Sequence, residues 1–149
     1  MSLKHFIFLF LLFALTFQIS AQKKSIIINE VLASNSKGYS DGFWEHDDWI
    51  ELYNLTDSSI QLSGMFLTDD PEEPTKHEIG NSEKWTSVES KEFILLWVDN
   101  DPEQGKRHIS FSLNKKGGYI GLYGRDTVLI DEVYYSVQKR DNSLGQIKV

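Results

Sequence analysis

The run Asp48-Trp49-Ile50-Glu51-Leu52-Tyr53-Asn54 decides the fold. At the period of two that side chains follow along a strand, Ile50 and Leu52 form an apolar face, and the alternate residues place the carboxylate of Glu51 between two aromatic rings. Aromatic and β-branched content favours a strand, and Asn54 opens the turn that ends it. The apolar face suits a core, whereas the half-polar face requires partners elsewhere in the chain.

Length and composition limit the classes of protein. With 149 residues, 40% of them hydrophobic, the chain can bury one core and fits a single domain. Because the chain contains no cysteine, disulfides, thiolate metal sites and cysteine nucleophiles are excluded. The formal charge of −7 argues against general nucleic-acid binding, since a surface that tracks phosphates needs clustered lysine and arginine.

Residues 1–21 have the pattern of a secretory signal peptide. Lys4 precedes a nearly unbroken apolar run, Phe6–Phe17, and the small residue Ala21 stands before the expected cleavage site. This run falls short of the ~20 residues that a spanning helix needs, so we expect no transmembrane segment after cleavage and a secreted or cell-surface location. The folded domain is then 22–149, with a formal charge of −8, because the signal holds one lysine and no acidic residue.

The remaining chain alternates short strand patterns with glycine, proline and acidic turns. Besides the opening run, strands are expected at Ile26–Ala33, Ser59–Leu62, Met65–Thr68, Thr75–Ile79, Glu92–Val98, His108–Leu113, Tyr119–Tyr123 and Thr127–Tyr135. The longest apolar run, Glu92–Val98, is the expected central core strand, while Trp85–Val88 stays ambiguous. No segment shows a convincing helical period. The pattern predicts an all-β, antiparallel β-sandwich.

A series of ordered motifs extends over nearly all of the chain after the signal. They are Ile28–Asn35, Asp48–Asn54, Leu62–Asp70, Pro74–Lys76, Phe93–Asp99, His108–Leu113, Gly117–Tyr123, Ile130–Asp131 and Ser143–Gly145. Taken together, they resemble the lamin tail domain family in its bacterial secreted form. The resemblance implies an immunoglobulin-like β-sandwich without a disulfide and a non-catalytic module. In bacteria such modules often accompany secreted hydrolases, nucleases among them.

Motifs for catalysis are missing from the sequence, which contains no Gly-x-Ser-x-Gly, no His-Glu-x-x-His and no phosphate-binding glycine loop. We therefore expect no enzyme and no organic cofactor. Acidic loops at 45–48, 69–73 and 99–103 leave a structural calcium ion open, because hard cations favour oxygen ligands. The candidate ligands are Asp47, Asp48, Asp69, Asp70, Asp99 and Asp101. The alternative is that these carboxylates only solubilise an acidic protein.

Two further sets of residues have predicted roles. Phe43 and Trp44, in a polar loop, are the aromatic residues least easily explained as core, and together with His46 they are the candidate ligand surface. A second set is expected to be architectural, with Asp48 and Glu51 holding the loop 34–47 through hydrogen bonds, Glu30 standing opposite Glu51 in an antiparallel pair, and asparagine amides fixing turns. The members of this set are Glu30, Asn35, Asp48, Glu51 and Asn54.

The leading hypothesis is a secreted or surface module, non-catalytic, that binds or adheres to a protein or a cell-surface polysaccharide. The alternative is an accessory domain of an extracellular hydrolase or nuclease, stabilised by calcium. A third option is a purely structural surface protein.

Overall fold

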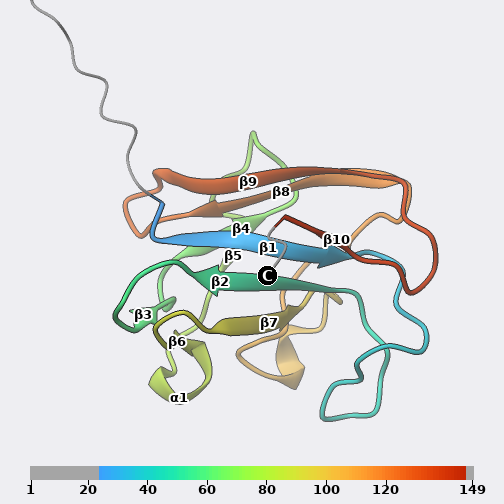
Figure 1. The fold of residues 1–149 in the computed structure, drawn as a ribbon, viewed down its shortest axis with the longest axis horizontal. Coiled ribbons are helices and arrows are strands. Elements are labelled where there is room, and N and C mark those ends of the chain that lie inside the picture. The colour runs from blue at the N-terminus through green and yellow to red at the C-terminus, as the bar shows by residue number, and fades with distance from the viewer. Residues whose placement is uncertain (1–23, 147–149) are drawn as a thin grey trace, which may run out of the picture.

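The computed structural model describes residues 24–146, so the predicted signal peptide at 1–21 lies outside it. Within this range two four-stranded antiparallel sheets pack face to face, with strand orders β10-β1-β2-β7 and β5-β4-β8-β9 (Figure 1). A two-stranded ribbon, β3-β6, accompanies them. The strands are β1 (Ile26–Leu32), β2 (Trp49–Asn54), β3 (Ile60–Gln61), β4 (Phe66–Thr68), β5 (His77–Glu78), β6 (Ser87–Val88), β7 (Phe93–Trp97), β8 (Gly117–Tyr123), β9 (Leu129–Ser136) and β10 (Leu144–Gly145).

Helical structure in the described part is confined to two single turns, α1 (Glu83–Thr86) and the 3-10 turn η1 (Pro102–Gln104). None of its helices is both long and apolar enough to cross a membrane. The predicted β-sandwich is therefore confirmed. The ambiguous segment Trp85–Val88 divides into the end of α1 and the short strand β6.

The core lies between the two sheets and follows the period-two pattern. On β2, Ile50 and Leu52 are fully buried, while Glu51 and Tyr53 on the other face are partly exposed. The opposing sheet contributes the buried face of β8, including Ile120 and Leu122. Burying such a side chain stabilises the fold by about 1.5–3 kcal/mol relative to leaving it exposed. Non-polar burial on both inner faces therefore holds the layers together.

Strands β1 and β2 pair antiparallel with Glu30 opposite Glu51, the pairing expected from the sequence. A bulge interrupts the pair, because Ile28 lies opposite Leu52 and Glu30 opposite Glu51, which leaves Asn29 as the extra residue. The Asn29 side-chain amide donates a hydrogen bond of 2.8 Å to the carboxylate of Glu51. The side-chain amide of the bulged residue is thus hydrogen-bonded to a side chain of the neighbouring strand.

Two strand predictions need correction. The segment Glu92–Val98 contributes β7, which is an edge strand and not a central one. Its burial alternates, because Ile94 and Leu96 face the core while Phe93 lies on the outer face. The segment His108–Leu113 forms only isolated bridges, yet of its alternating apolar residues Ile109 and Phe111 are buried and Leu113 is partly buried. It fails to form a strand because it wraps the end of β7, where the Ile109 N–H donates to Trp97 and the Asn100 N–H reaches the carbonyl of Ile109.

A buried carboxylate connects the two sheets. Asp131 of β9 accepts hydrogen bonds from the backbone N–H of Ile28 on β1 (2.7 Å) and from the half-exposed ammonium group of Lys24 (2.5 Å). Strand β10 pairs with β1 only at Glu30 and Val31, so the N–H of Ile28 lies beyond that pairing. The side chain of Asp131 supplies the acceptor that a longer neighbouring strand would have supplied.

We predict that Asp131→Ala lowers the free energy of unfolding by about 2–3 kcal/mol, because it leaves a buried N–H without its charged acceptor. Lys24→Ala should cost less than about 1 kcal/mol, since solvent screens the half-exposed ammonium group. Urea denaturation measures both changes. Glu132→Ala, at the exposed neighbouring position, is the control. Equal losses for Asp131→Ala and Glu132→Ala would contradict the inter-sheet role.

Candidate functional site

The loop between β1 and β2 is organised by Asn35. Its side-chain N–H groups donate to the carbonyls of Tyr39 (2.7 Å) and Asp47 (2.9 Å), and its side-chain oxygen accepts from the N–H of Gly38 (3.0 Å). Asp48 accepts from the N–H of Asn35 at 3.0 Å. Burial raises the pKa of the Asp48 carboxyl, and this hydrogen bond partly opposes the shift. The side chains of Asn35 and Asp48 thus join the beginning of the loop to its end.

The other predicted loop-fixing residues hold different segments. Glu51 bonds to Asn29 in the β1 bulge and not to the loop 34–47 that we predicted as its partner, because its side chain lies beside the extra residue of β1. Glu30 accepts a hydrogen bond from the Ser143 hydroxyl near β10. The Asn54 amide, fully buried, donates to the carbonyls of Ser58 (2.7 Å), Val88 (3.0 Å) and Glu89 (3.0 Å).

Three carboxylates converge at the tip of the loop. Oxygens from Asp41, Glu45 and Asp47 lie within 4.8 Å of one another. The Asp41 Oδ1 accepts from the N–H groups of Phe43 (2.9 Å) and Glu45 (2.8 Å), which closes a tight turn. The Asp41 side chain is fully buried, and its Oδ2 has no hydrogen-bond partner, although the His108 Nε2 lies 4.0 Å away.

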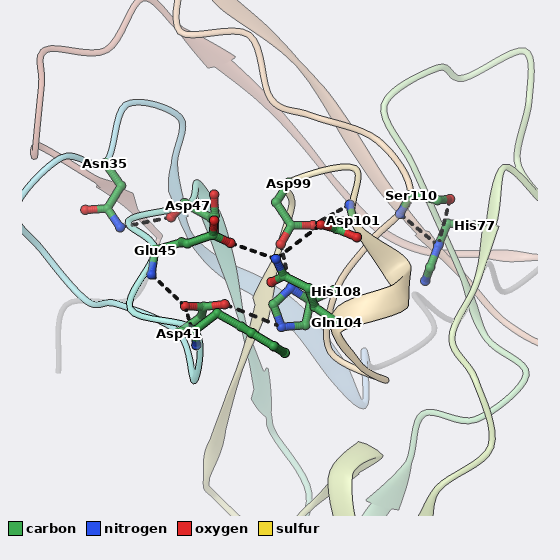
Figure 2. Close-up of polar contacts among 11 residues, drawn as sticks. Asn35, Asp41, Glu45, Asp47, His77, Asp99, Asp101, Gln104, His108 and Ser110 are labelled. Atoms are coloured by element: carbon green, nitrogen blue, oxygen red, sulfur yellow. Dashed lines mark hydrogen bonds and ion pairs between the residues drawn. The ribbon is translucent and has the colours of Figure 1, made fainter.

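The acidic cluster continues onto the segment after β7, which comes from a distant part of the sequence (Figure 2). The His108 Nδ1 lies 2.5 Å from the Asp99 Oδ2, and the Gln104 amide donates to Glu45 (2.7 Å) and Asp101 (3.1 Å). The Gln104 Oε1 and the Asp47 Oδ2 are also buried without a hydrogen-bond partner. The arrangement therefore concentrates oxygen atoms that lack donors.

Electrostatic repulsion in the cluster is visible at Asp47. Burial raises the pKa of the Asp47 carboxyl above its ordinary value, and the neighbouring carboxylates, first that of Asp99, raise it further. His108 opposes only part of this effect. The net shift thus reflects burial together with several carboxylates held close to one another.

The six carboxylates predicted as metal ligands are distributed over the molecule. Asp47 belongs to the cluster, and Asp99 and Asp101 adjoin it through His108 and Gln104. Asp48 is turned to Asn35, Asp69 pairs with Lys76 at 2.7 Å, and Asp70 accepts from the N–H of Glu72 at 2.9 Å.

An aromatic groove of about 410 Å³ lies next to the cluster. Its aromatic walls are Phe43, Trp85 and Trp97, and its polar lining includes Arg107. The guanidinium group of Arg107 lies 5.6 Å from the Trp85 ring centroid, and its Nε donates to the Trp85 carbonyl at 2.9 Å. The groove thus combines flat apolar rings with hydrogen-bond donors. The remaining lining residues are Gly42, Gln104, Gly105, Lys106 and His108.

Of the three predicted ligand-surface residues, only Phe43 lines this groove. Trp44 is 87% exposed and has a left-handed backbone φ of 68°, and the His46 Nδ1 lies 3.3 Å from the Tyr39 carbonyl. Prediction from sequence missed Asp41, which reads only as a turn former, and Gln104, which carries no pattern at all. Arg107 was also missed.

One histidine and serine pair deserves comparison with a catalytic arrangement. The His77 Nδ1 lies 2.9 Å from the Ser110 hydroxyl, and the same nitrogen accepts from the Ser110 N–H at 3.1 Å. A nitrogen that accepts from a backbone N–H is already engaged in holding the segment 108–113. This geometry joins β5 to that segment and is architectural.

The layered antiparallel sheets, the cysteine-free core and the sheet connections define an immunoglobulin-like β-sandwich. The family model of the Lamin Tail Domain matches residues 19–137, and the chain belongs to that family of non-catalytic, immunoglobulin-like domains. The predicted family is thereby confirmed, while its bacterial secreted form stays a prediction. No curated protein and no solved structure matches the chain.

Asn35→Ala should lower the free energy of unfolding by about 1–2 kcal/mol, because it removes an amide that makes three hydrogen bonds within the loop. Backbone amides of residues 36–47 should also exchange faster with deuterium. Chemical denaturation and hydrogen exchange measure the two effects. Ser40→Ala, in the same loop at an exposed position, is the control, and equal behaviour of both variants would contradict the role of Asn35.

His77 predicts a pH dependence of stability. Burial lowers the pKa of its imidazole, and the charge of Glu78 opposes part of the shift. The contribution of neutral His77 is therefore present above the unfolded pKa of about 6.5 and is lost as the pH falls through the lower folded pKa.

His77→Asn keeps an acceptor for the Ser110 N–H but cannot titrate in this range. Its melting temperature should fall less than that of the unmodified protein between about pH 7 and about pH 5. Calorimetry at several pH values measures the difference. Parallel pH profiles for the two proteins would show that His77 does not contribute.

Proposed function

We propose that the chain is an exported, non-catalytic binding module whose ligand surface is the groove lined by Phe43, Trp85 and Trp97. The observation that carries this proposal is Trp85, which is 47% exposed at a groove that also offers the donors of Arg107. An aromatic face beside charged donors is a common arrangement for binding flat, polar ligands. The signal-like pattern of residues 1–21 supports an extracellular setting.

The charge around the groove favours an anionic ligand. The Lys84 ammonium group lies 4.4 Å from the Trp85 ring centroid, and Lys106 and Arg107 line the groove. This concentration of positive charge occurs on a chain whose formal charge is −7. We infer that the ligand is a cell-surface polysaccharide bearing carboxylate or sulfate groups, whose sugar rings stack on tryptophan while its acidic groups meet the basic side chains.

A non-catalytic role agrees with the chemistry beside the groove. The imidazole of His108 contacts the carboxylate of Asp99. The residues that line the groove include no serine or threonine, and Lys106 is the lysine among them. The Lys106 side chain is exposed. The lining therefore offers recognition groups without an activated nucleophile.

Binding is tested by isothermal titration with polygalacturonate and alginate as anionic polymers and dextran as the neutral one. We expect binding to the anionic polymers, and we expect Trp85→Ala to weaken it by at least about tenfold, because stacking surface is lost. Arg107→Gln should weaken it as well, and added salt should reduce affinity.

Tyr134→Ala is the matched aromatic control, since Tyr134 is 69% exposed on β9 of the other sheet. Equal affinities for the Trp85 and Tyr134 variants would place the ligand elsewhere. No binding to either anionic polymer, or equal binding to dextran, would overturn the proposed ligand class.

A further inference from the structure

We propose that Asp41, Glu45 and Asp47, with the side-chain oxygen of Gln104, form a calcium site at the tip of the β1–β2 loop. The site adjoins the aromatic groove proposed above as a ligand surface and shares Gln104 with it, but its test does not depend on polysaccharide binding.

The first observation is the spacing of the carboxylates. One oxygen from each of Asp41, Glu45 and Asp47 lies within 4.8 Å of the others. Oxygens that share a calcium ion at about 2.3–2.6 Å are separated by up to roughly twice that distance. The three side chains are thus close enough to contact one ion without moving the backbone. Magnesium, with ligands at about 2.0–2.1 Å in strict octahedral geometry, fits this spacing less well.

The second observation is independent of the acidic clustering. The Asp41 side chain is fully buried, yet its Oδ2 has no hydrogen-bond partner. The Oε1 of Gln104, a neutral side chain from η1, is also buried without a partner. Buried side-chain oxygens without a hydrogen-bond partner are rare in folded proteins, and the free lone pair on each could coordinate an ion. Figure 2 shows the Glu45 carboxylate against the Gln104 amide, and the Asp41 Oδ2 turned toward His108.

The positively charged side chains of the described residues do not balance the three carboxylates. Among the described residues, no lysine or arginine forms an ion pair with any of the three carboxylates, and His108 is the neighbouring group that can carry charge. Its Nδ1 is already taken by Asp99, and its Nε2 lies 4.0 Å from Asp41, which is too long for a hydrogen bond. Even a protonated imidazole would leave most of the negative charge uncompensated.

Backbone geometry shows how the loop presents the ligands. The Asp41 Oδ1 accepts from the N–H groups of Phe43 and Glu45 in the turn, while Oδ2 faces His108 without a hydrogen bond. The Gln104 amide nitrogen anchors Glu45 at 2.7 Å. Two segments that are far apart in the sequence therefore meet at the ion, and calcium would join the β1–β2 loop to η1. Water molecules would complete the six to eight oxygens that calcium requires.

Calcium binding is tested on the purified protein, freed of metal with EDTA, in a buffer of constant pH. We expect titration calorimetry with calcium chloride to give a dissociation constant of about 0.1–1 mM, the range of extracellular calcium modules. We expect the melting temperature to rise by about 5 °C in ~10 mM calcium, and less in magnesium at the same concentration.

Asp41→Asn is the sharpest variant, because an asparagine oxygen can still accept from the turn while the charge and the free Oδ2 are lost. In EDTA this variant should melt at or above the temperature of the unmodified protein, since repulsion is relieved, and calcium should no longer raise it. Asp47→Asn should behave in the same way. Asp57→Asn, whose side chain is 94% exposed and distant from the cluster, should keep the full calcium response.

Three results would overturn the site. One is the absence of a calcium-induced shift in the unmodified protein. Another is an equal shift with sodium chloride at matched ionic strength, which would mean general screening of charge. The last is an undiminished calcium response in both Asp41→Asn and Asp47→Asn. Loss of polysaccharide binding alone has no bearing on these readouts.

Discussion

The carboxylate of Asp131 satisfies a polar group that the strand arrangement leaves open. Strand β10 is too short to cover β1 along its whole length, so the N–H of Ile28 would face a buried place without an acceptor. The side chain reaches it from the opposite sheet. Just after β9, the side-chain amide of Gln138 accepts from the N–H of Ala33 and donates to the carbonyl of Val31 at the end of β1. Side chains of one sheet thus complete the backbone hydrogen bonding of the other, and this fixes how the two layers align.

That alignment positions two loops with opposite electrostatic character. Asp41 and Glu45 flank Phe43 in the sequence, so the acidic cluster and one wall of the basic, aromatic groove belong to the same turn. Gln104 also belongs to both places, as a neighbour of Glu45 and as part of the groove lining. A change in the conformation of this turn would therefore alter the lining of the groove. The acidic cluster and the basic groove are adjacent because the loop between β1 and β2 meets the segment after β7 at one end of the sandwich.

Local patterns predicted much of the fold. The alternation at Ile50 and Leu52 identifies β2 and its buried face, and turn residues separate the strands correctly in most places. The edge position of β7 was not predictable, because an apolar run has the same pattern whether its second hydrogen-bonding edge is covered by a strand or by a loop. The acidic cluster was only partly predicted, since Asp47 was named but Asp41 was not. Gln104 and His108, which lie beside these carboxylates, are far from Asp41 in the sequence and come close to it only when the sandwich has folded.

The position of β1 has a consequence for the order of folding events. The first strand lies between β2 and β10 and contacts β9, so its complete set of partners includes segments from both ends of the domain. Chains dominated by such distant contacts fold slowly, because long loops must close before the contacts form. As the chain is synthesised, β1 and β2 can pair early, but β1 keeps an uncovered edge until residues 131 and 144–145 have followed. The nascent chain therefore exposes an unpaired strand edge until the last strands have been made.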